Sequence, residues 1–381
     1  PLFVRRQRQI LIRAGVMGML AHTDITGAVR LSHNAHEPIP ADGVLTIVDD
    51  DMIAMRIDSI KNELPLGGSD GERFSLAGSQ SKFALTRLED RWFKPNGVVP
   101  STHVFKPESP RTADAEVIEN ATMSLADRIG IPAPRSSVMR FDDASSYVVK
   151  RFDRSCESGG IERIHQEDFM QALGRVDHRG RSKYSVDSRD VIAMLRTLNP
   201  ELPYDWTKRL AFNIAVGNVD AHAKNYGVMI PEDSSFALAP EYDALTTVYW
   251  DFVDKRPPFA IGGQRGYAMT SEKNWLAFAR RNAMDADRVL SIVGEVNDKV
   301  MAGIAEVYDD LHVDATIRDR VLGIIDVIHA TAPSASPGSI GRSRHALPRG
   351  ARGHSTVHVH EYERADGVIV HEHERRAPGA R

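Results

Sequence analysis

The stretch Gly217-Asn-Val-Asp-Ala-His-Ala-Lys-Asn-Tyr-Gly-Val228 is a polar loop between two apolar segments. A helix-like run, 206–216, precedes the loop, and a short apolar strand, 228–230, follows it. Its polar side chains therefore lie in a turn between two buried elements. Because catalytic groups are often carried by loops that a rigid scaffold holds, this loop is a candidate functional site.

The loop contains an acid and an amide at a spacing that is used in phosphoryl transfer. Asn225 follows Asp220 by five positions. In the catalytic loop of kinases, the Asp that accepts a hydroxyl proton and the Asn that binds a metal have the same spacing. A further acid, Asp243, follows the next predicted strand, 236–238. One Asp as a base, with an Asn and a later Asp as ligands of Mg²⁺, is a kinase arrangement. The spacing by itself favours a plain loop with Asn and Asp as turn residues.

Length and composition limit the class of protein. A chain of 381 residues predicts two or three domains, or one large bilobal domain. The net charge of -4 gives no general attraction to nucleic acid or anionic membranes. The single cysteine, Cys156, excludes a disulfide within the chain and is typical of a reducing cytoplasm. No apolar run is long enough to cross a bilayer, and the first residue, Pro1, indicates a sequence that begins inside a domain.

The first part of the chain alternates short strands with a small-residue loop and two helices. A helix is predicted over 49–62, and a loop of small residues, 74–82, runs into a strand. The later elements are a helix around 118–129 and strands over 83–88, 102–106, 136–141 and 146–152. This order is typical of the β-rich N-terminal lobe of a kinase.

The second part of the chain is predicted to be mainly helical. The predicted helices cover 166–173, 187–198, 206–216, 271–283, 285–308 and 313–331. The helix 285–308 carries an apolar stripe that predicts a core face: Val289, Ile292, Val293, Val296, Val300, Ile304 and Val307.

After about residue 332 the composition changes to Pro, Ser, Gly and Arg, which predicts a disordered tail. The tail also contains alternating histidines, which could bind a transition metal weakly or belong to a solvated polar segment: His358, His360, His371 and His373.

Several segments, taken in order, resemble the HipA family of serine/threonine kinases, the toxin halves of HipBA-type toxin–antitoxin modules. The resemblance covers residues from about 70 to 310. The matching segments are Ser75-Leu-Ala-Gly-Ser-Gln-Ser-Lys82, Thr102-His-Val-Phe-Lys106, Glu119-Asn-Ala-Thr-Met-Ser-Leu-Ala126, Ile129-Gly-Ile-Pro132, Lys150-Arg-Phe-Asp153, His165-Gln-Glu-Asp168, Lys183-Tyr184, Asn218-Val-Asp-Ala-His-Ala-Lys-Asn225 and Ala239-Pro-Glu-Tyr-Asp243.

The resemblance implies an α+β, bilobal, protein-kinase-like fold, with a β-rich N-lobe, an all-helical C-lobe and a disordered C-terminal tail. The implied domains are a partial N-terminal subdomain, 1–68, a kinase domain, 69–331, and a His/Arg-rich tail, 332–381. Within the kinase domain the lobes would cover about 69–155 and about 156–331. The family's N-terminal subdomain is usually longer than the segment before the small-residue loop here.

The resemblance also implies a Mg²⁺-ATP site. Asp220 would be the catalytic base or would orient the acceptor hydroxyl, while Asn225 and Asp243 would hold Mg²⁺. Glu119 could pair with a lysine in the cleft, or be an exposed helix residue. The residues implied to contact ATP are Ala77, Gly78, Ser79, Gln80, Ser81, Lys82, Lys106, Lys150, Arg151, Phe152, His222, Ala223, Lys224, Asn225, Tyr242 and Asp243.

For regulation, the family implies autophosphorylation of the loop serine, which is Ser75 here, after which the loop leaves the nucleotide pocket. Ser79 and Ser81 are alternative acceptors. The implied partners are a DNA-binding HipB-like antitoxin, DNA mainly through that antitoxin, and a protein substrate such as an aminoacyl-tRNA synthetase. Two alternatives stay open: a non-catalytic, kinase-like corepressor that binds an antitoxin on operator DNA, and a small-molecule kinase.

Overall fold

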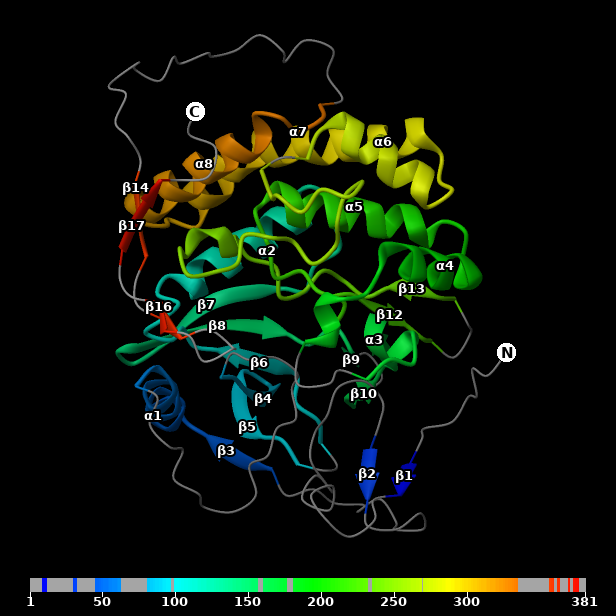
Figure 1. Cartoon of the computed structure of the whole chain (residues 1–381). Helices are drawn as coiled ribbons and strands as arrows, with labels where there is room; N and C mark the ends of the chain where they lie inside the picture. The colour runs from blue at the N-terminus through cyan, green and yellow to red at the C-terminus, as the bar shows by residue number, and fades with distance from the viewer. Residues whose placement is uncertain are drawn as a thin grey trace. The chain divides into compact units, whose positions relative to one another are not determined.

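The structure is a computed structural model of the chain (Figure 1). It describes residues 9–11, 30–32, 45–62, 81–96, 99–156, 160–176, 181–231, 235–268, 270–334, 356–359, 362–363, 369–370 and 373–376. The chain divides into two compact units, Pro1–Ser336 and Pro337–Arg381. The first unit contains the candidate site.

A six-stranded antiparallel sheet forms the first lobe of the Pro1–Ser336 unit. The strand order is β3 (Thr46–Val48), β5 (Arg91–Lys94), β4 (Phe83–Leu88), β6 (His103–Lys106), β8 (Ala144–Lys150) and β7 (Ser136–Phe141). β3 and β5 were not predicted from the sequence. With three and four residues, they are too short to show an alternating pattern.

One helix covers part of one face of this sheet. α1 (Asp50–Lys61) begins at Asp49, whose side chain accepts a hydrogen bond from the backbone N–H of Met52 at 2.9 Å. Its buried isoleucines follow a helical spacing and pack against aromatic residues of the sheet: Ile53, Ile57, Ile60, Phe83, Trp92, Phe105 and Phe141. The helix predicted over 49–62 is thus confirmed, and it closes a small core of its own.

The second lobe is mainly helical (Figure 1). A second helix, α2 (Ala115–Arg128), contacts both the sheet, at β7 and β8, and the helical lobe, at α7. The elements after β8 are β9 (Arg154–Ser155), β10 (Glu162–Arg163), β11 (Gln166–Asp168), α3 (Phe169–Ala172), η3 (Ser182–Tyr184), α4 (Ser188–Leu198), α5 (Leu202–Ala215), β12 (Gly227–Met229), β13 (Ala237–Leu238), η4 (Thr247–Tyr249), α6 (Glu272–Arg281), α7 (Ala286–Asp310) and α8 (Ala315–His329).

The apolar stripe predicted for α7 lies in the larger core of the unit. Six of its seven residues are buried, and Ile292 is half-buried. Among the described helices, none is both long and apolar enough to cross a membrane. Cys156 is exposed and free.

Two predicted helix starts were wrong. The segment 166–173 begins as strand β11, which pairs with β12 in the antiparallel register Gln166↔Met229, and becomes helical only at Phe169. The backbone N–H of Phe169 is bonded to the carbonyl oxygens of Ala223 and Tyr226, so a tertiary contact decides the start of α3. α5 begins at Leu202, four residues before the predicted start, with a proline in its first turn, where no N–H is needed.

The Pro337–Arg381 unit contains short paired strands. β14 (Thr356–Val359) pairs with β17 (His373–Arg376), and β15 (Tyr362–Glu363) pairs with β16 (Ile369–Val370), both antiparallel. An isolated two-stranded hairpin is marginally stable in water, so the predicted disorder of the tail stays a prediction. His360 and His371 lie outside the described residues, so the metal hypothesis also stays a prediction.

A glycine shapes the turn between α5 and the polar loop. Gly217 has φ +71°, and a Cβ at this position would lie 2.6 Å from Val248 Cγ2 and 3.1 Å from Ile328 Cδ1. Positive φ and close packing both exclude a side chain here. The sharp reversal lets the loop return from the end of α5 towards β12.

We expect Gly217→Ala to lower the free energy of unfolding by about 2–3 kcal/mol, because the methyl group meets Val248 and the backbone is strained. The matched control is Gly323→Ala in α8, where a Cβ has no atom within 4 Å. This change should stabilise the protein by about 0.5–1 kcal/mol. Urea unfolding measures both, and equal effects would contradict the geometry of the turn.

His103 on β6 predicts a pH dependence of stability. Burial, with Arg87 and Lys150 nearby, lowers the pKa of His103 to about 4. Since the unfolded chain takes up this proton first, stability should be complete above about pH 6.5 and should fall as pH drops towards 4. The loss should be about 2 kcal/mol, allowing for the part of the ring that water screens.

Urea midpoints at pH 7.5 and pH 4.5 test this expectation. His103→Gln should reduce the difference between the two midpoints, whereas the exposed His312→Gln should leave it as in wild type. An unchanged difference in His103→Gln would show that His103 is not held neutral in the folded protein.

Candidate active site

Lys106 is the centre of the site. The β6–β8 register pairs Lys106 with Tyr147, and the lysine is 7% exposed. Its Nζ lies 2.6 Å from Glu119 Oε1 on α2 and 2.6 Å from Asp243 Oδ1, in the segment that follows β13. One ammonium group thus joins the sheet to α2 and to the helical lobe.

The three charged groups set each other's ionisation. Burial opposes the charge on Lys106, but Asp243 and Glu119 hold the pKa of this lysine above its ordinary value. Burial also opposes the charge on Asp243, yet Lys106 and Lys82 hold its pKa well below the ordinary range. For Glu119, burial prevails and raises the pKa, against the opposing effect of Lys106. Asp243 is therefore an ionised carboxylate at neutral pH, which is the form that binds metals.

The polar loop after α5 is held by its own hydrogen bonds. Asn218 Oδ1 accepts from the backbone N–H of Asp220 at 3.1 Å, and the backbone N–H of Asn225 donates to the carbonyl of His222 at 2.8 Å. The side chain of Asn225 donates from Nδ2 to the carbonyl of Asp220 at 3.1 Å. This contact uses the amide nitrogen, and a metal would take the other atom, the amide oxygen.

Two residues of η3 contact the polar loop. The hydroxyl of Tyr184 donates to Asp220 Oδ1 at 2.6 Å, and Lys183 Nζ lies 2.6 Å from His222 Nε2. The backbone carbonyl of Lys183 also accepts from the N–H of Ala223 at 3.2 Å. Sequence reasoning assigned neither residue to the site. The family match contains this pair, but no local pattern indicates that it contacts a loop 36 residues later.

His222 is buried and neutral. Burial lowers its pKa, with Asp220 opposing and Lys183 adding to the decrease. Because Nε2 faces the Lys183 ammonium and accepts from it, the ring proton lies on Nδ1. This Nδ1 is buried, and it has no hydrogen-bond partner within the part of the chain that the structure describes.

Two other predicted residues lie beside Lys106 and Asp243. Burial lowers the pKa of Lys82, which is also influenced by Asp243 and by the positive charges of Lys106 and Lys183. The ring of Tyr242 packs against Phe152 with a centroid distance of 5.3 Å. Lys82 and Lys106 thus lie near the carboxylate of Asp243, and Tyr242, whose ring packs against Phe152, directly precedes Asp243 along the chain.

Three predicted contact residues have their side chains engaged elsewhere. The register pairs Lys150 with His103, and both line a groove with Arg135 on the sheet face opposite to Lys106. Arg151 binds Asp153 through two hydrogen bonds of 2.9 and 2.8 Å and also Ser101 at 2.9 Å. Ala223 is fully buried. The side chains of these three residues therefore do not line the site around Lys106, and the backbone N–H groups of Arg151 and Ala223 already donate to the carbonyls of Thr102 and Lys183.

The small-residue loop lies mostly outside the described residues. This holds for Ser75, Ala77, Gly78, Ser79 and Gln80, whereas Ser81 and Lys82, directly before β4, are described. The predicted roles of the loop therefore stay predictions.

Comparisons with known proteins identify the family and the fold. A family model, described as the HipA-like C-terminal domain, matches residues 74–304. The chain belongs to the HipA family. The protein Y4mE of Sinorhizobium fredii is 30% identical over 307 residues, which cover 77% of this chain and 72% of that protein. The serine/threonine-protein kinase toxin HipA of Shewanella oneidensis is 26% identical over 251 residues, which cover 62% of this chain and 57% of the toxin.

A solved structure shows the fold of this HipA-family chain. It is the Shewanella oneidensis HipA in complex with HipB and its operator DNA, and it matches with a TM-score of 0.67 at 22% identity. The match covers 83% of this chain and 76% of that one. The predicted family and the α+β, kinase-like fold class are confirmed.

The ion-pair triad predicts a large stability effect for its central residue. Lys106→Met removes the ammonium group that contacts both Glu119 and Asp243 and leaves the charge of Lys82 as a partial counter-charge, so we expect a loss of about 3 kcal/mol in the free energy of unfolding. The control Lys299→Met removes an exposed pair with Glu295 and should change stability by less than about 0.5 kcal/mol. Urea unfolding measures both variants, and similar small effects would mean that the triad is not held together in solution.

Proposed function

We propose that this HipA-family chain is an ATP-dependent serine/threonine protein kinase that uses Mg²⁺. The observation that carries the proposal is the contact of Lys106 with both Glu119 and Asp243, next to a loop that contains Asp220 and Asn225. Phosphoryl transfer depends mostly on positioning and electrostatic stabilisation. These residues are of the types that this chemistry requires.

The residues present fit Mg²⁺ and phosphate groups. Mg²⁺ prefers hard oxygen ligands, and Asp243 offers an ionised carboxylate while Asn225 offers an amide oxygen. Bound Mg²⁺ would supply positive charge against the phosphate oxygens. Lys106, already cationic and fixed by Glu119, would bind phosphate oxygens of ATP, and Lys82 would add positive charge beside it.

The acceptor hydroxyl would be held by Asp220. This carboxylate accepts a hydrogen bond from the Tyr184 hydroxyl in the structure, so it can accept one from a substrate serine or threonine. Asp220 would orient that hydroxyl and take its proton as the new oxygen–phosphorus bond forms, while the bond between the γ-phosphorus and its bridging oxygen breaks and ADP leaves.

The finer features of the family extend this proposal. Ser75 would be autophosphorylated, with Ser79 or Ser81 as alternatives, and would thereby inactivate the kinase. A HipB-like, DNA-binding antitoxin is the proposed partner, supported by the complex in which the Shewanella oneidensis HipA was solved. The proposed substrate is a translation protein such as an aminoacyl-tRNA synthetase, in the cytoplasm.

Asp220→Ala tests the catalytic assignment. We expect phosphate transfer to protein to fall by about 10²–10⁴-fold, because the hydroxyl loses its base and its orienting group, while Mg²⁺-ATP still binds. The control is Asp251→Ala, whose carboxylate is 90% exposed and which should behave as wild type. Growth on expression, nucleotide binding and mass spectrometry of phosphorylated proteins, Ser75 included, are measured for all three.

Two outcomes would overturn the proposal. If Mg²⁺-ATP does not bind the wild type, the site is not a nucleotide site, and the kinase-like corepressor becomes the better hypothesis. If wild type and Asp220→Ala transfer phosphate equally, Asp220 is not the catalytic group.

A further inference from the structure

Glu241 is a buried carboxylate whose side chain is 2% exposed. It lies two residues before Asp243, and its segment is anchored at both sides. Its backbone N–H donates to the carbonyl of Pro132 at 2.7 Å, and the hydroxyl of Tyr242 donates to the carbonyl of Lys224 at 2.9 Å. The segment that leads to Asp243 is thus hydrogen-bonded to the connection that follows α2 and to the polar loop.

A line of side-chain hydrogen bonds runs from Glu241 to the polar loop. Asn213 Nδ2 on α5 donates to Glu241 Oε1 at 2.7 Å, and Asn218 Nδ2 donates to Asn213 Oδ1 at 2.7 Å. Asn218 Oδ1 then accepts the backbone N–H of Asp220 at 3.1 Å. Every donor in this line points towards the carboxylate of Glu241, so the bonds polarise one another in the same direction.

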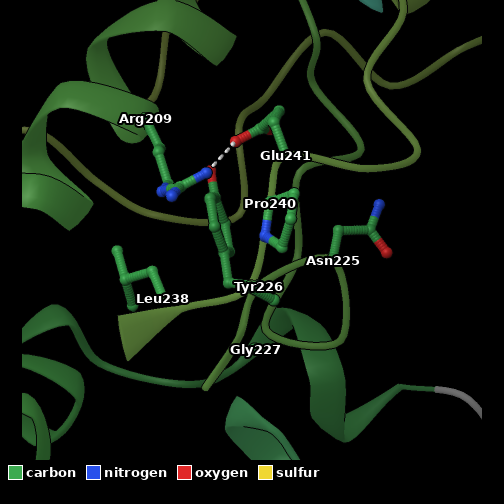
Figure 2. A pocket seen from close by; sticks show the side chains of 8 residues that line it. Arg209, Asn225, Tyr226, Gly227, Leu238, Pro240 and Glu241 are labelled. Atoms are coloured by element: carbon green, nitrogen blue, oxygen red, sulfur yellow. Dashed lines mark ion pairs between the residues drawn. The ribbon is translucent and has the colours of Figure 1, made fainter. Parts of the chain in front are cut away.

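Arg209 on α5 provides the counter-charge. Figure 2 shows the Arg209 and Glu241 side chains meeting beside the ring of Tyr226, with Nη1 and Oε2 3.7 Å apart. Burying such a pair removes both charges from water, and an apolar replacement is often as stable. Stability alone is therefore a weak explanation for this pair, whereas fixing the geometry of a neighbouring site is a better one.

The neighbouring site needs such support. Asp243 has φ +60°, a left-handed backbone conformation that is unfavourable for a residue with a side chain. Backbone strain of this kind is unfavourable and persists only when surrounding contacts enforce it. Glu241 and Tyr242, both fixed by hydrogen bonds, directly precede this strained residue.

We propose that Glu241 is a positioning residue that couples the segment of Asp243 to the loop of Asp220 through Asn213 and Asn218. Glu241 touches no reacting atom; it sets where the metal ligand lies relative to the catalytic base. The proposal rests on the proposed kinase function for its effect on rate, but its structural coupling can be measured without activity.

Two variants of Glu241 distinguish the effect of its hydrogen bond to Asn213 from the effect of the space that its side chain fills. Glu241→Met fills similar space but offers Asn213 no oxygen acceptor, whereas Glu241→Gln retains an oxygen. We expect Glu241→Met to lower kcat by about 10–100-fold with the KM for ATP within about threefold of wild type, as for groups that orient metal ligands. Glu241→Gln should restore kcat to within about threefold of wild type. Equal kcat values in the two variants would overturn the proposal.

A double-mutant cycle tests the coupling. Asn218→Ala breaks the line at its other end and leaves the Arg209–Glu241 pair in place. If the line acts as one unit, Glu241→Met combined with Asn218→Ala should lower kcat little more than the larger single effect. Multiplicative effects would show that the two residues act independently.

Hydrogen exchange gives a measurement that needs no catalysis. Asn218→Ala should speed amide exchange of the segment 239–243, and Glu241→Met should speed exchange of 217–225, while Glu241→Gln and a remote segment such as 300–310 stay as in wild type. Unchanged exchange in both segments would overturn the coupling. If the wild type transfers no phosphate, the proposed function fails, and this exchange still decides the coupling.

Discussion

One ammonium group between two carboxylates holds the site together. Lys106 comes from the sheet, Glu119 from α2 and Asp243 from the segment after β13, and the lysine is almost completely buried. The buried groups Lys106 and Glu119 must be paired, and the half-buried Asp243 completes the pairing. The triad therefore requires the sheet and the helical lobe to meet at one geometry, and the remaining site residues are placed relative to it.

Around this triad, apolar packing provides stability, and polar contacts fix the positions of the functional side chains. The larger core is apolar and includes α2 and α7, which gives the helical lobe most of its favourable free energy. Buried polar groups add little net stability because their desolvation offsets their attraction. Instead, contacts such as Tyr184 with Asp220 and Asn213 with Glu241 specify where the functional side chains lie.

The elements with a long periodic pattern were predictable from the sequence, and the short ones were not. α1 and α7 show helical spacing over three or more turns, and the stripe of α7 and the isoleucines of α1 are buried as the pattern predicts, whereas Met52 and Met55, part of the apolar pattern of α1, are exposed. β3 and β5 have too few residues for a pattern, so they were missed. β11 was predicted as helix because its pairing partner, β12, lies about 60 residues later in the chain.

The candidate site was also only partly predictable from the sequence. The spacing within one loop and the order of several motifs identified Asp220, Asn225, Asp243 and Lys106 as a set. The face on which a strand residue lies was not evident: Lys106 turns towards α2, whereas Lys150 turns to the opposite side of the sheet. Nor could spacing indicate that Tyr184 would contact Asp220, or that Arg209 and Asn213 would converge on Glu241.

The sequence by itself determined the long helices apart from the start of α5, the polar loop and the residue types of the site, because these depend on side-chain chemistry and on neighbours a few positions away. Only the tertiary structure decided which charges pair, which histidine nitrogen carries the proton and which carboxylates stay ionised. Those properties depend on burial and on groups brought together across long stretches of chain, such as Lys106 and Asp243, which are 137 residues apart. Burial strengthens electrostatic interactions between groups that share no local pattern in the sequence.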